Sequence, residues 1–476
     1  MSNHTNPTHQ TGHAIVIGGS IAGLLTARVL TNHFAQVTVI ERDLLPQTPD
    51  FRKGAPHARH AHGLLVRGQQ IMESYFPGLT DDLLAQGAIA ANMGTELSLY
   101  IGGVPVQPFA SDLVITACSR PLLEHTIGRR LRALPQVRLL EGYDVSGICT
   151  DPNRQRATGV RVQSRQEQGG AEIIHADLIV DASGRNSRLP DWLAELGYPV
   201  PAETTVDARA GYATRIYKRP ADYAGAWQAL YGIPQAPRQS RGCIIAPLEG
   251  DRWHVTLTGL NGDHPPTDEE GFLAFARTIP VPELFRALSQ AEPLTEPYGF
   301  RRAANRLRHY DKLSRYLEGL LAIGDAVYAL NPVYGQGMTV AALGAVALDE
   351  TLRTQRCHPA DDPTGLARRF QRALAKDIAA PWQMATGQDL RWPSAGSGYR
   401  PDPITQLVQR YFDQVLVAMT DNPEIAAAFA KVQNMLASPA TLFHPRIVWQ
   451  VIKAAQQTVG KSPMTGPITM SDRVQA

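Results

Sequence analysis

The sequence predicts an α/β protein with a parallel sheet assembled from separate segments, a second mixed or antiparallel sheet and a helical C-terminal region. Three features of its 476 residues indicate this fold class. A short apolar strand near the N-terminus runs into a glycine-rich turn, a helix and another strand. Two more apolar strands ending in small residues follow near residues 180 and 320. Alternating apolar and polar stretches separate them, and the pattern becomes helical after about residue 361.

The first glycine-rich turn lies in the order of elements that dinucleotide-binding units share. Residues 14–17 form the strand, the turn runs from Gly18 to Gly23, and residues 24–31 continue as a helix. Residues 37–40 form the next strand, which ends at Glu41. The complete order, with its terminal acid, favours a Rossmann-like dinucleotide site over an ordinary strand–turn–helix. This unit alone does not separate NAD from FAD.

Each position of the turn has a physical role. Gly18 permits the tight turn, and Gly23 lets the helix pack closely on the sheet. The backbone N–H groups near Ser20 open the helix, and the helix dipole favours a pyrophosphate there. Ser20 stands where the GxGxxG pattern has its middle glycine, and it is small enough for a phosphate to approach. The predicted cofactor contacts of this unit are Gly18, Ser20, Ile21, Ala22, Gly23, Glu41 and Arg42.

Two later segments select FAD. Residues 176–188 form an apolar strand that runs into a turn of small residues. Residues 319–323 form another strand, which ends in Gly324 and Asp325. A loop with Pro332 then leads to a Gly-Gln-Gly-Met stretch and to a small-residue helix ending near residue 352.

With these segments the sequence resembles the flavoprotein monooxygenases of the p-hydroxybenzoate hydroxylase fold over nearly the whole chain. The resemblance implies that Asp325 holds the ribityl chain and the phosphates, and that Gly335 and Gly337 lie beside the isoalloxazine ring. A helix N-terminus near Met338 would then favour the anionic, reduced flavin. The further FAD contacts that the resemblance implies are Arg52, Arg120, Val145 near the adenine, Gly324, Asp325, Gly335, Gln336, Gly337 and Met338.

Within that family the sequence looks most similar to bacterial epoxidases of polyether biosynthesis. The similar stretches are residues 52–62, 119–124, 182–189 and 331–338. Two positions depart from the family pattern. Ser183 precedes Gly184 where the family has Asp-Gly, which puts direct reduction by NAD(P)H in doubt, and His57 follows Pro56 where Pro-Gln is common. A single GxGxxG-like turn argues against disulfide reductases and Baeyer–Villiger enzymes.

Several conspicuous side chains have competing interpretations. His57, His60 and His62 form an HxxHxH cluster, but no Cys or carboxylate nearby completes a metal site, so no metal is expected. These histidines either bond backbone and water or lie near the flavin entrance. Ser183 and Ser187 lack the Gly-x-Ser-x-Gly pattern of a hydrolase nucleophile. Tyr334 either lines the pocket or packs. The sequence nominates no catalytic side chain.

The recurrence of flavin segments predicts a discontinuous FAD-binding domain of residues 1–60, 109–194 and 299–360. Residues 61–108 and 195–298 are assigned to a substrate domain whose sheet can roof the flavin. Its expected strands are residues 211–217, 242–246 and 253–258. Residues 361–476 form the helical C-terminal region, with helices expected at 404–419 and 424–436.

Composition restricts the class of protein further. A net charge of +2 gives no case for nucleic-acid binding. The four cysteines form no CxxC pair, which argues against a disulfide framework and fits a reducing cytosol. No apolar run reaches the ~18–20 residues of a transmembrane helix, and the N-terminus lacks the order of a signal peptide. We therefore expect a cytoplasmic protein.

The resemblance implies the reaction. Reduced FAD would react with O2 to form a C4a-hydroperoxide, which transfers one oxygen atom to an apolar organic substrate in secondary metabolism. The electrons would come from NAD(P)H or from a separate flavin reductase. An alkene would give an epoxide and an aromatic ring a phenol, and the lack of a nominated base favours epoxidation. The alternatives are a prenyl-reductase-like FAD-dependent reductase or dehydrogenase and a non-catalytic flavin-binding protein. A flavin halogenase is disfavoured because no WxWxIP-like stretch occurs.

Overall fold

The computed structural model describes residues 11–166, 170–221, 223, 225, 227–301, 303–356, 364–395 and 401–459. Its central element is a five-stranded sheet, in the order β20-β11-β1-β2-β7, in which all neighbours are parallel. The strands are β1 (His13–Ile17), β2 (Gln36–Glu41), β7 (Val137–Glu141), β11 (Leu178–Asp181) and β20 (Leu320–Ala322). Strands from four distant parts of the chain therefore share one sheet, as the sequence predicts.

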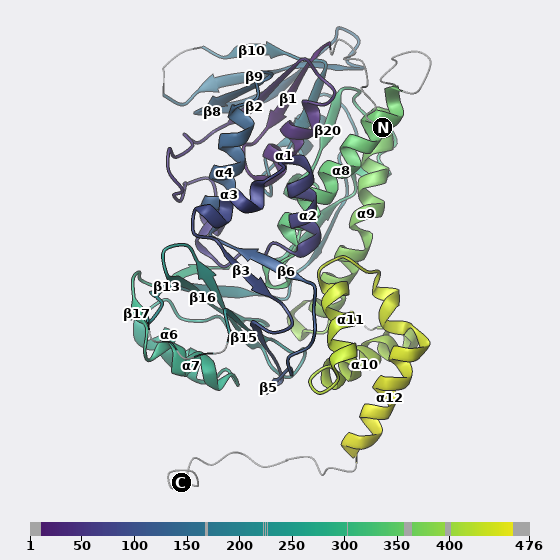
Figure 1. Cartoon of the computed structure of the whole chain (residues 1–476). Helices are drawn as coiled ribbons and strands as arrows, with labels where there is room; N and C mark the ends of the chain where they lie inside the picture. Colours follow the sequence, from purple (N-terminus) through teal and green to yellow (C-terminus); the bar gives the residue numbers. More distant parts are fainter. Residues whose placement is uncertain are drawn as a thin grey trace, which may run out of the picture.

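Helices and a second small sheet cover this parallel sheet (Figure 1). On one side α1 packs against α4 and α8, and α8 packs against α2 and α9. On the other side the antiparallel sheet β10-β9-β8 contacts β11 and β2. The elements are α1 (Ile21–Leu30), α2 (Val66–Tyr75), α3 (Leu79–Ala85), α4 (Arg120–Arg132), α8 (Gly337–Arg356), α9 (Leu366–Asp389), β8 (Tyr143–Thr150), β9 (Ala157–Ser164) and β10 (Glu172–His175).

The second large sheet is mixed and has eight strands, in the order β17-β13-β16-β15-β14-β4-β5 with β18 also paired to β13. Only the β14–β4 pair among them is parallel. The strands are β4 (Leu97–Ile101), β5 (Val104–Pro105), β13 (Gly211–Lys218), β14 (Ala229–Ile233), β15 (Arg241–Leu248), β16 (Arg252–Gly259), β17 (Glu292–Pro293) and β18 (Tyr298–Phe300).

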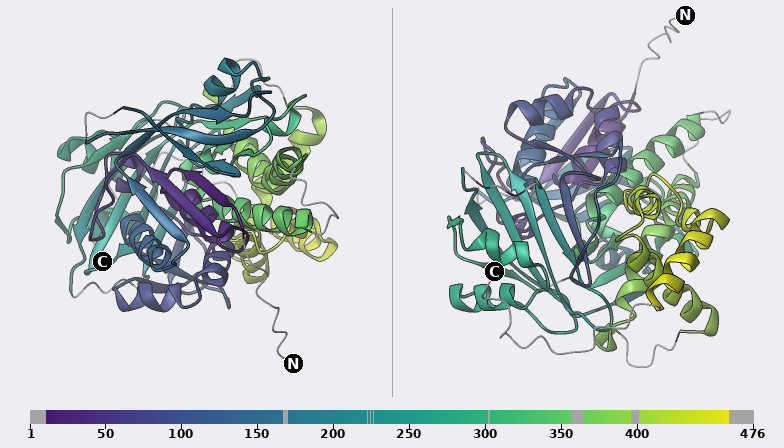
Figure 2. Two further views of the ribbon diagram at one scale, coloured as in Figure 1. Left: turned by 90° about the horizontal axis from the view of Figure 1, so that it is seen from above. Right: turned by 60° about the horizontal axis from the view of Figure 1, so that its bottom comes forward.

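The two faces of this mixed sheet differ in chemistry, because side chains alternate along each strand. One face packs Trp253, Val255 and Leu257 into an apolar core with α6 (Glu269–Arg277) and α7 (Pro282–Leu288). The alternate residues of β16, among them His254 and Thr256, point to the opposite face and are also buried. That polar face is turned toward the rest of the molecule, on the side away from α6 and α7 (Figure 2).

The structure also contains two further small sheets. One consists of β12 (Glu203–Val206), β19 (Asn305–Arg308) and β21 (Tyr328–Ala329), and the other of β3 (Ile89–Asn92) and β6 (Val114–Ala117). The short α5 (Leu189–Glu195) follows β11.

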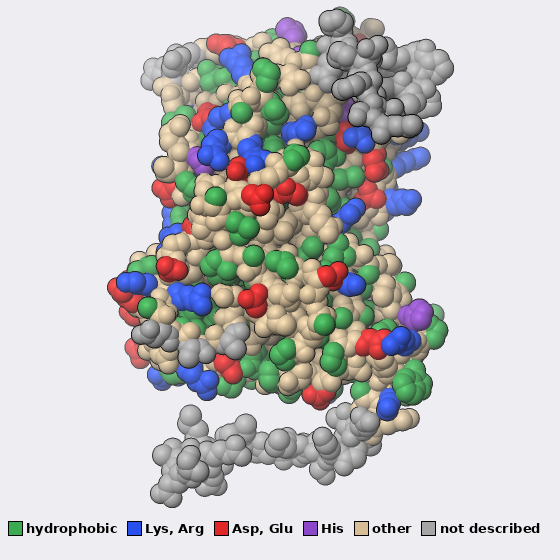
Figure 3. Space-filling model, in the orientation of Figure 1, with side chains coloured by type: hydrophobic (Ala, Val, Ile, Leu, Met, Phe, Trp, Pro, Cys, Tyr) green, Lys and Arg blue, Asp and Glu red, His purple; other side chains and the backbone are tan. Residues whose placement is uncertain are grey.

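The C-terminal region has its own apolar core. It contains α10 (Pro403–Ala418), α11 (Pro423–Gln433) and α12 (Pro445–Val459). The helix predicted at 424–436 ends three residues early, at Gln433, because Met435 takes a left-handed backbone with φ 57° that a helix does not allow. The surface carries mixed charges of both signs over these regions (Figure 3). Within the described residues no helix combines the length and apolar character needed to cross a bilayer.

Three of the four cysteines are free thiols. They are Cys118, Cys149 and Cys243; the fourth, Cys357, lies outside the described residues.

Candidate cofactor and active site

The glycine-rich turn packs tightly on itself and against the end of β11. Gly18 has φ 106°, and a Cβ there would lie 2.6 Å from the carbonyl oxygen of Ala182, at the end of β11. A Cβ on Gly23 would lie 1.8 Å from the carbonyl oxygen of Gly18. Neither position has room for a side chain, so both glycines have the geometric roles expected of them. The start of α1 can therefore approach the ends of β1 and β11.

Glu41 lies at the end of β2, where the sequence places it, and is buried. One carboxylate oxygen accepts a hydrogen bond from the Gly19 N–H at 2.7 Å, and the other accepts from the Asp43 N–H at 3.0 Å. Arg52 pairs with the same carboxylate at 3.1 Å. The acid is thus fixed beside the glycine turn, in the position from which a ribose hydroxyl can be held.

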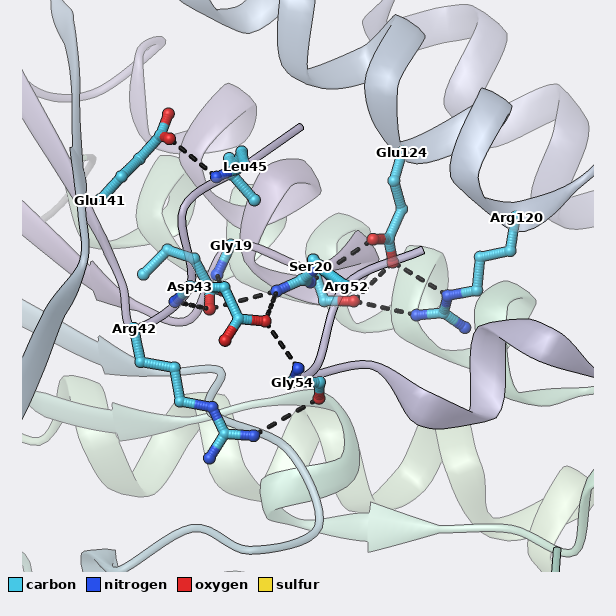
Figure 4. A network of polar contacts seen from close by, with 11 residues as sticks. Gly19, Ser20, Arg42, Asp43, Leu45, Arg52, Gly54, Arg120, Glu124 and Glu141 are labelled. Atoms are coloured by element: carbon cyan, nitrogen blue, oxygen red, sulfur yellow. Dashed lines mark hydrogen bonds and ion pairs between the residues drawn. The ribbon is translucent and has the colours of Figure 1, made fainter. Parts of the chain in front are cut away.

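A buried network of charges links the turn to α4 (Figure 4). Glu124 accepts hydrogen bonds from the Ser20 hydroxyl at 2.6 Å and from the Arg120 Nε at 2.9 Å. Arg52 lies 3.4 Å from its other oxygen, and Arg120 also donates to the Ser20 hydroxyl at 2.9 Å. Burial opposes the charge of Glu124, but Arg120 and Arg52 outweigh it and hold the pKa of that carboxyl below its usual range.

The Gly-Asp turn after β20 meets the start of α1. Gly324 has φ 62°, and a Cβ there would lie 2.7 Å from the Cβ of Ala22. Solvent reaches the Asp325 side chain, but the surrounding protein disfavours its charge and raises its pKa. Arg185, Arg120 and Arg306 oppose this shift. The carboxylate predicted to hold the ribityl chain therefore lies near arginine side chains, whose positive charge also suits phosphates.

The second predicted cofactor loop ends in an open glycine. Gly335 has φ 65°, and a Cβ there would come within 3.9 Å of the Gly63 Cα. Gly337 is the first residue of α8 and is exposed. Apart from its chain neighbours and the adjacent backbone of α8, no heavy atom of the described residues lies within 4 Å of the position its Cβ would take. The neighbouring Gln336 is buried, and its Oε1 has no hydrogen-bond partner among the described residues. A flat ligand can therefore lie against the N-terminus of α8, where backbone N–H groups and the helix dipole favour negative charge.

The turn after β11 is held by its own carboxylate. Asp181 is fully buried and accepts hydrogen bonds from the hydroxyls of Ser183 and Ser187, each at 2.5 Å, and from the Ser183 N–H at 3.0 Å. Burial raises the pKa of Asp181, and these hydrogen bonds oppose the rise. Both serines thus donate to a structural carboxylate, and among the described residues neither hydroxyl is hydrogen-bonded to a histidine that could activate it.

His60, the second histidine of the HxxHxH stretch, lies against the polar face of the mixed sheet. His60 Nδ1 is 2.8 Å from the Thr214 hydroxyl, and His62 Nδ1 is 2.8 Å from the His60 carbonyl. From the sheet, His254 Nε2 bonds the Arg59 carbonyl at 2.8 Å. Burial lowers the pKa of His60 and of His254 to about 4, so both rings are neutral at pH 7. Throughout the described ranges no three His, Cys, Asp or Glu side chains are grouped to hold a metal ion.

A small pocket lies beside the N-terminus of α8 and is bordered by α4. It brings together Arg120 and Met338, two of the predicted cofactor contacts. Burial raises the pKa of its Cys118 thiol to about 12, so this thiol is neutral. The pocket is lined mainly by apolar side chains: His62, Leu64, Leu83, Thr116, Cys118, Ser119, Arg120, Leu123 and Met338.

The predicted site residues thus fall into connected groups. Ser20, Arg52, Glu41 and Arg120 share one network, and Ala22 meets Gly324. Arg42 is exposed and joins the edge of this network (Figure 4): it reaches the Gly54 carbonyl at 3.4 Å, and the Gly54 N–H donates to Asp43, an ion-pair partner of Arg52. Val145 lies on β8, the strand that contacts β2. Sequence reasoning missed Glu124, Arg185 and Asp389. Glu124 had a weak signal, because it follows Arg120 by four residues, the spacing of an ion pair on a helix, which here is α4.

The fold and this site define a flavoprotein. The glycine turn with its acid suits an ADP group, the Gly-Asp turn with its arginines suits phosphates and a polyol, and the open Gly337 suits a flat ring. The buried Gln336 Oε1 without a partner adds a polar atom that such a ring could engage.

The chain belongs to the FAD-binding domain family, which it matches over residues 12–355. FAD is its cofactor. Protein Rv3254 of Mycobacterium tuberculosis is 34% identical over 441 residues, which cover 90% of each chain. Kynurenine 3-monooxygenase of Xanthomonas axonopodis pv. citri is 29% identical and covers 92% of this chain and 95% of its own. A flavoprotein/dehydrogenase structure from Cytophaga hutchinsonii matches 95% of this chain and all of its own with a TM-score of 0.66, at 15% identity, and so shows the fold.

Proposed function

We propose that this protein is an FAD-dependent monooxygenase that inserts one atom of O2 into an apolar organic substrate. The observation that carries the proposal is the open glycine at the N-terminus of α8, with the apolar side chains of Leu64, Leu123 and Met338 beside it. The similarity to monooxygenases in its own family supports the same reaction class. Reduced FAD, when bound, supplies the activation of O2.

The chain's own residues would prepare the site in two ways. The N–H groups at the start of α8 stabilise negative charge beside Gly337. Leu64, Leu123 and Met338 place apolar surface beside the N-terminus of α8, which would limit the access of water to a ring bound there. The Asp325 carboxylate and Arg120 would fix the polar part of the cofactor.

Alkene epoxidation is the favoured form of the reaction, and aromatic hydroxylation the other. Hydroxylation of a phenol benefits from a base that removes the phenolic proton. The titratable groups in the pocket are unsuited to this role: burial lowers the pKa of His62 far below its usual range, Cys118 is neutral, and Arg120 is cationic. Epoxidation requires no such base, and the sequence stretches similar to polyether epoxidases support it.

The electron donor is NAD(P)H or a separate flavin reductase. Ser183 stands where the family has an aspartate, and its hydroxyl is engaged with Asp181. We therefore expect slow reduction of the bound FAD by NADH or NADPH alone under anaerobic conditions and fast reduction by an added flavin reductase. Fast, saturable reduction by either nicotinamide alone would assign the donor directly.

An isotope experiment tests oxygen insertion. The FAD-loaded protein is reduced, mixed with a terminal alkene or a phenol under 18O2, and the products are weighed by mass spectrometry. One 18O atom in the product is the expected result. Oxygen derived from water would refute the proposal, and a hydrogenated product without oxygen would assign a reductase instead.

A pair of variants tests the pocket. Leu64→Phe enlarges a side chain beside the N-terminus of α8, where the substrate would meet the ring, and we expect it to raise KM for the alkene several-fold. The control is Leu84→Phe, because Leu84 is exposed on α3 beside the pocket residue Leu83. Equal KM values for both variants and the unaltered protein would show that the substrate binds elsewhere.

A further inference from the structure

A buried carboxylate from the C-terminal region reaches the loop before α8. Asp389 is the last residue of α9 and is fully buried. One of its oxygens accepts from the Tyr334 hydroxyl at 2.6 Å, and the other accepts from the side-chain amides of Asn331 at 3.0 Å and Asn305 at 2.6 Å. Burial raises the pKa of Asp389, and these three hydrogen bonds oppose the rise.

Asn331 joins this carboxylate to the mixed sheet. Its N–H donates to the Asn305 Oδ1 at 2.7 Å, and its own Oδ1 accepts from the Tyr212 hydroxyl on β13 at 2.5 Å and from the Val333 N–H at 3.2 Å. Asn331 and Asn305 are almost fully buried. From β14, the Tyr231 hydroxyl donates to the Val333 carbonyl at 2.8 Å. The loop is therefore held between the sheet and α9.

The other end of α9 holds the strand that leads into this region. The side-chain amide of Gln371 donates to the Ala322 carbonyl at 2.9 Å, directly before the Gly324–Asp325 turn. A helix of 24 residues spans about 36 Å, so α9 can reach both cofactor segments.

We propose that Asp389 is a positioning residue that fixes the Asn331–Gly337 loop in the shape that seats the isoalloxazine ring. This inference rests on the proposed ring position at Gly335 and Gly337 and is independent of the reaction. A carboxylate suits the position because its oxygens only accept hydrogen bonds, and three donors converge on it. A side-chain amide in its place would put an NH2 group, itself a donor, against the hydroxyl of Tyr334 or the side-chain amide of Asn331.

The experiment compares Asp389→Asn and Tyr334→Phe with the control Asp377→Asn, which removes an exposed carboxylate of the same helix. Three properties are measured: the Kd for FAD, the visible absorption bands of the bound FAD at saturation, and the thermal unfolding of the FAD-free protein. We expect Asp389→Asn to weaken FAD binding about tenfold, which corresponds to the loss of one hydrogen bond to a charged group, and to shift the bands. Tyr334→Phe should act in the same direction with a smaller effect. Asp377→Asn should change neither the Kd for FAD nor the absorption bands.

Two outcomes would overturn the inference. The first is a lower unfolding temperature for Asp389→Asn with an unchanged Kd and unchanged bands, since Asp389 would then only stabilise the fold. The second is an equal change in the bands for Asp377→Asn, since the effect would then come from the charge of α9. The ring position itself is checked separately by Gly337→Ala. If Gly337→Ala disturbs FAD binding and Asp389→Asn does not, only the role of Asp389 is refuted.

Discussion

Gly337→Ala separates cofactor binding from folding. Apart from its chain neighbours and the adjacent helix backbone, no heavy atom of the residues that the structure describes lies within 4 Å of the added methyl group. The backbone is helical, so the fold accepts alanine there. Replacing a glycine by alanine at a compatible position stabilises a protein by about 0.4–1 kcal/mol. The FAD-free variant should therefore unfold at an equal or higher urea concentration than the unaltered protein.

The same methyl group would enter the space proposed for the isoalloxazine ring. An extra methyl group in a well-packed site costs about 1–3 kcal/mol, so the Kd for FAD should rise roughly ten- to a hundredfold. The assay is titration of the FAD-free protein with FAD, followed by the quenching of flavin fluorescence. The control is Gly387→Ala, since Gly387 lies within α9 and likewise has no heavy atom of the described chain within 4 Å of its Cβ position, apart from its chain neighbours and the adjacent helix backbone. It should gain stability and leave the Kd unchanged. An unaltered Kd for Gly337→Ala, with the gain in stability present, would refute the ring position.

Three further predictions concern stability. Gly23→Ala places a Cβ 1.8 Å from the Gly18 carbonyl oxygen, and we expect the free energy of unfolding in urea to fall by at least about 2 kcal/mol; a change below 0.5 kcal/mol would contradict the close approach. Glu124→Gln removes the ion-pair partner of the largely buried Arg120, while Arg52 keeps Glu41 and Asp43, and should cost about 3 kcal/mol at pH 7. Because the folded pKa of Glu124 is lowered, this contribution is present above the unfolded pKa and is lost as the pH falls below it, so the two proteins should converge in acid. His60 and His254, with pKa values lowered to about 4, should each make stability fall by about 1.4 kcal/mol per pH unit between pH 6.5 and 4, and His254→Asn should show a shallower slope.

The sequence predicts the parallel sheet well because the signals are local. Apolar strands that run directly into glycine or small residues mark β1, β11 and β20, and the crowding at Gly18 and Gly23 explains why those positions require glycine. The polar face of the mixed sheet could also be predicted, because apolar and polar residues alternate with a period of two along β13 and β16.

The contacts that complete the site were beyond prediction for a physical reason. The Ser20–Glu124 bond joins residues 104 positions apart, and the bonds of Asp389 to Asn305 and Tyr334 span 84 and 55 positions. Contacts at such distances depend on how helices pack on sheets, and a single polar residue in a helix carries no mark of its partner. The open question about Tyr334 had the same origin. Its ring could pack or line a pocket, and only the position of α9 shows that its hydroxyl bonds Asp389.

The loop before α8 shows why these distant contacts matter for a flavoprotein. A segment with Gly335 and Gly337 near its end has high conformational freedom, and ordering it costs free energy that local bonds do not offset. Here the compensating bonds come from β13, β14 and α9, which are the mixed sheet and the C-terminal region. The parts of the chain outside the parallel sheet therefore hold the loop where we place the flavin ring. A variant that loosens α9 should disturb the flavin before it disturbs the sheet.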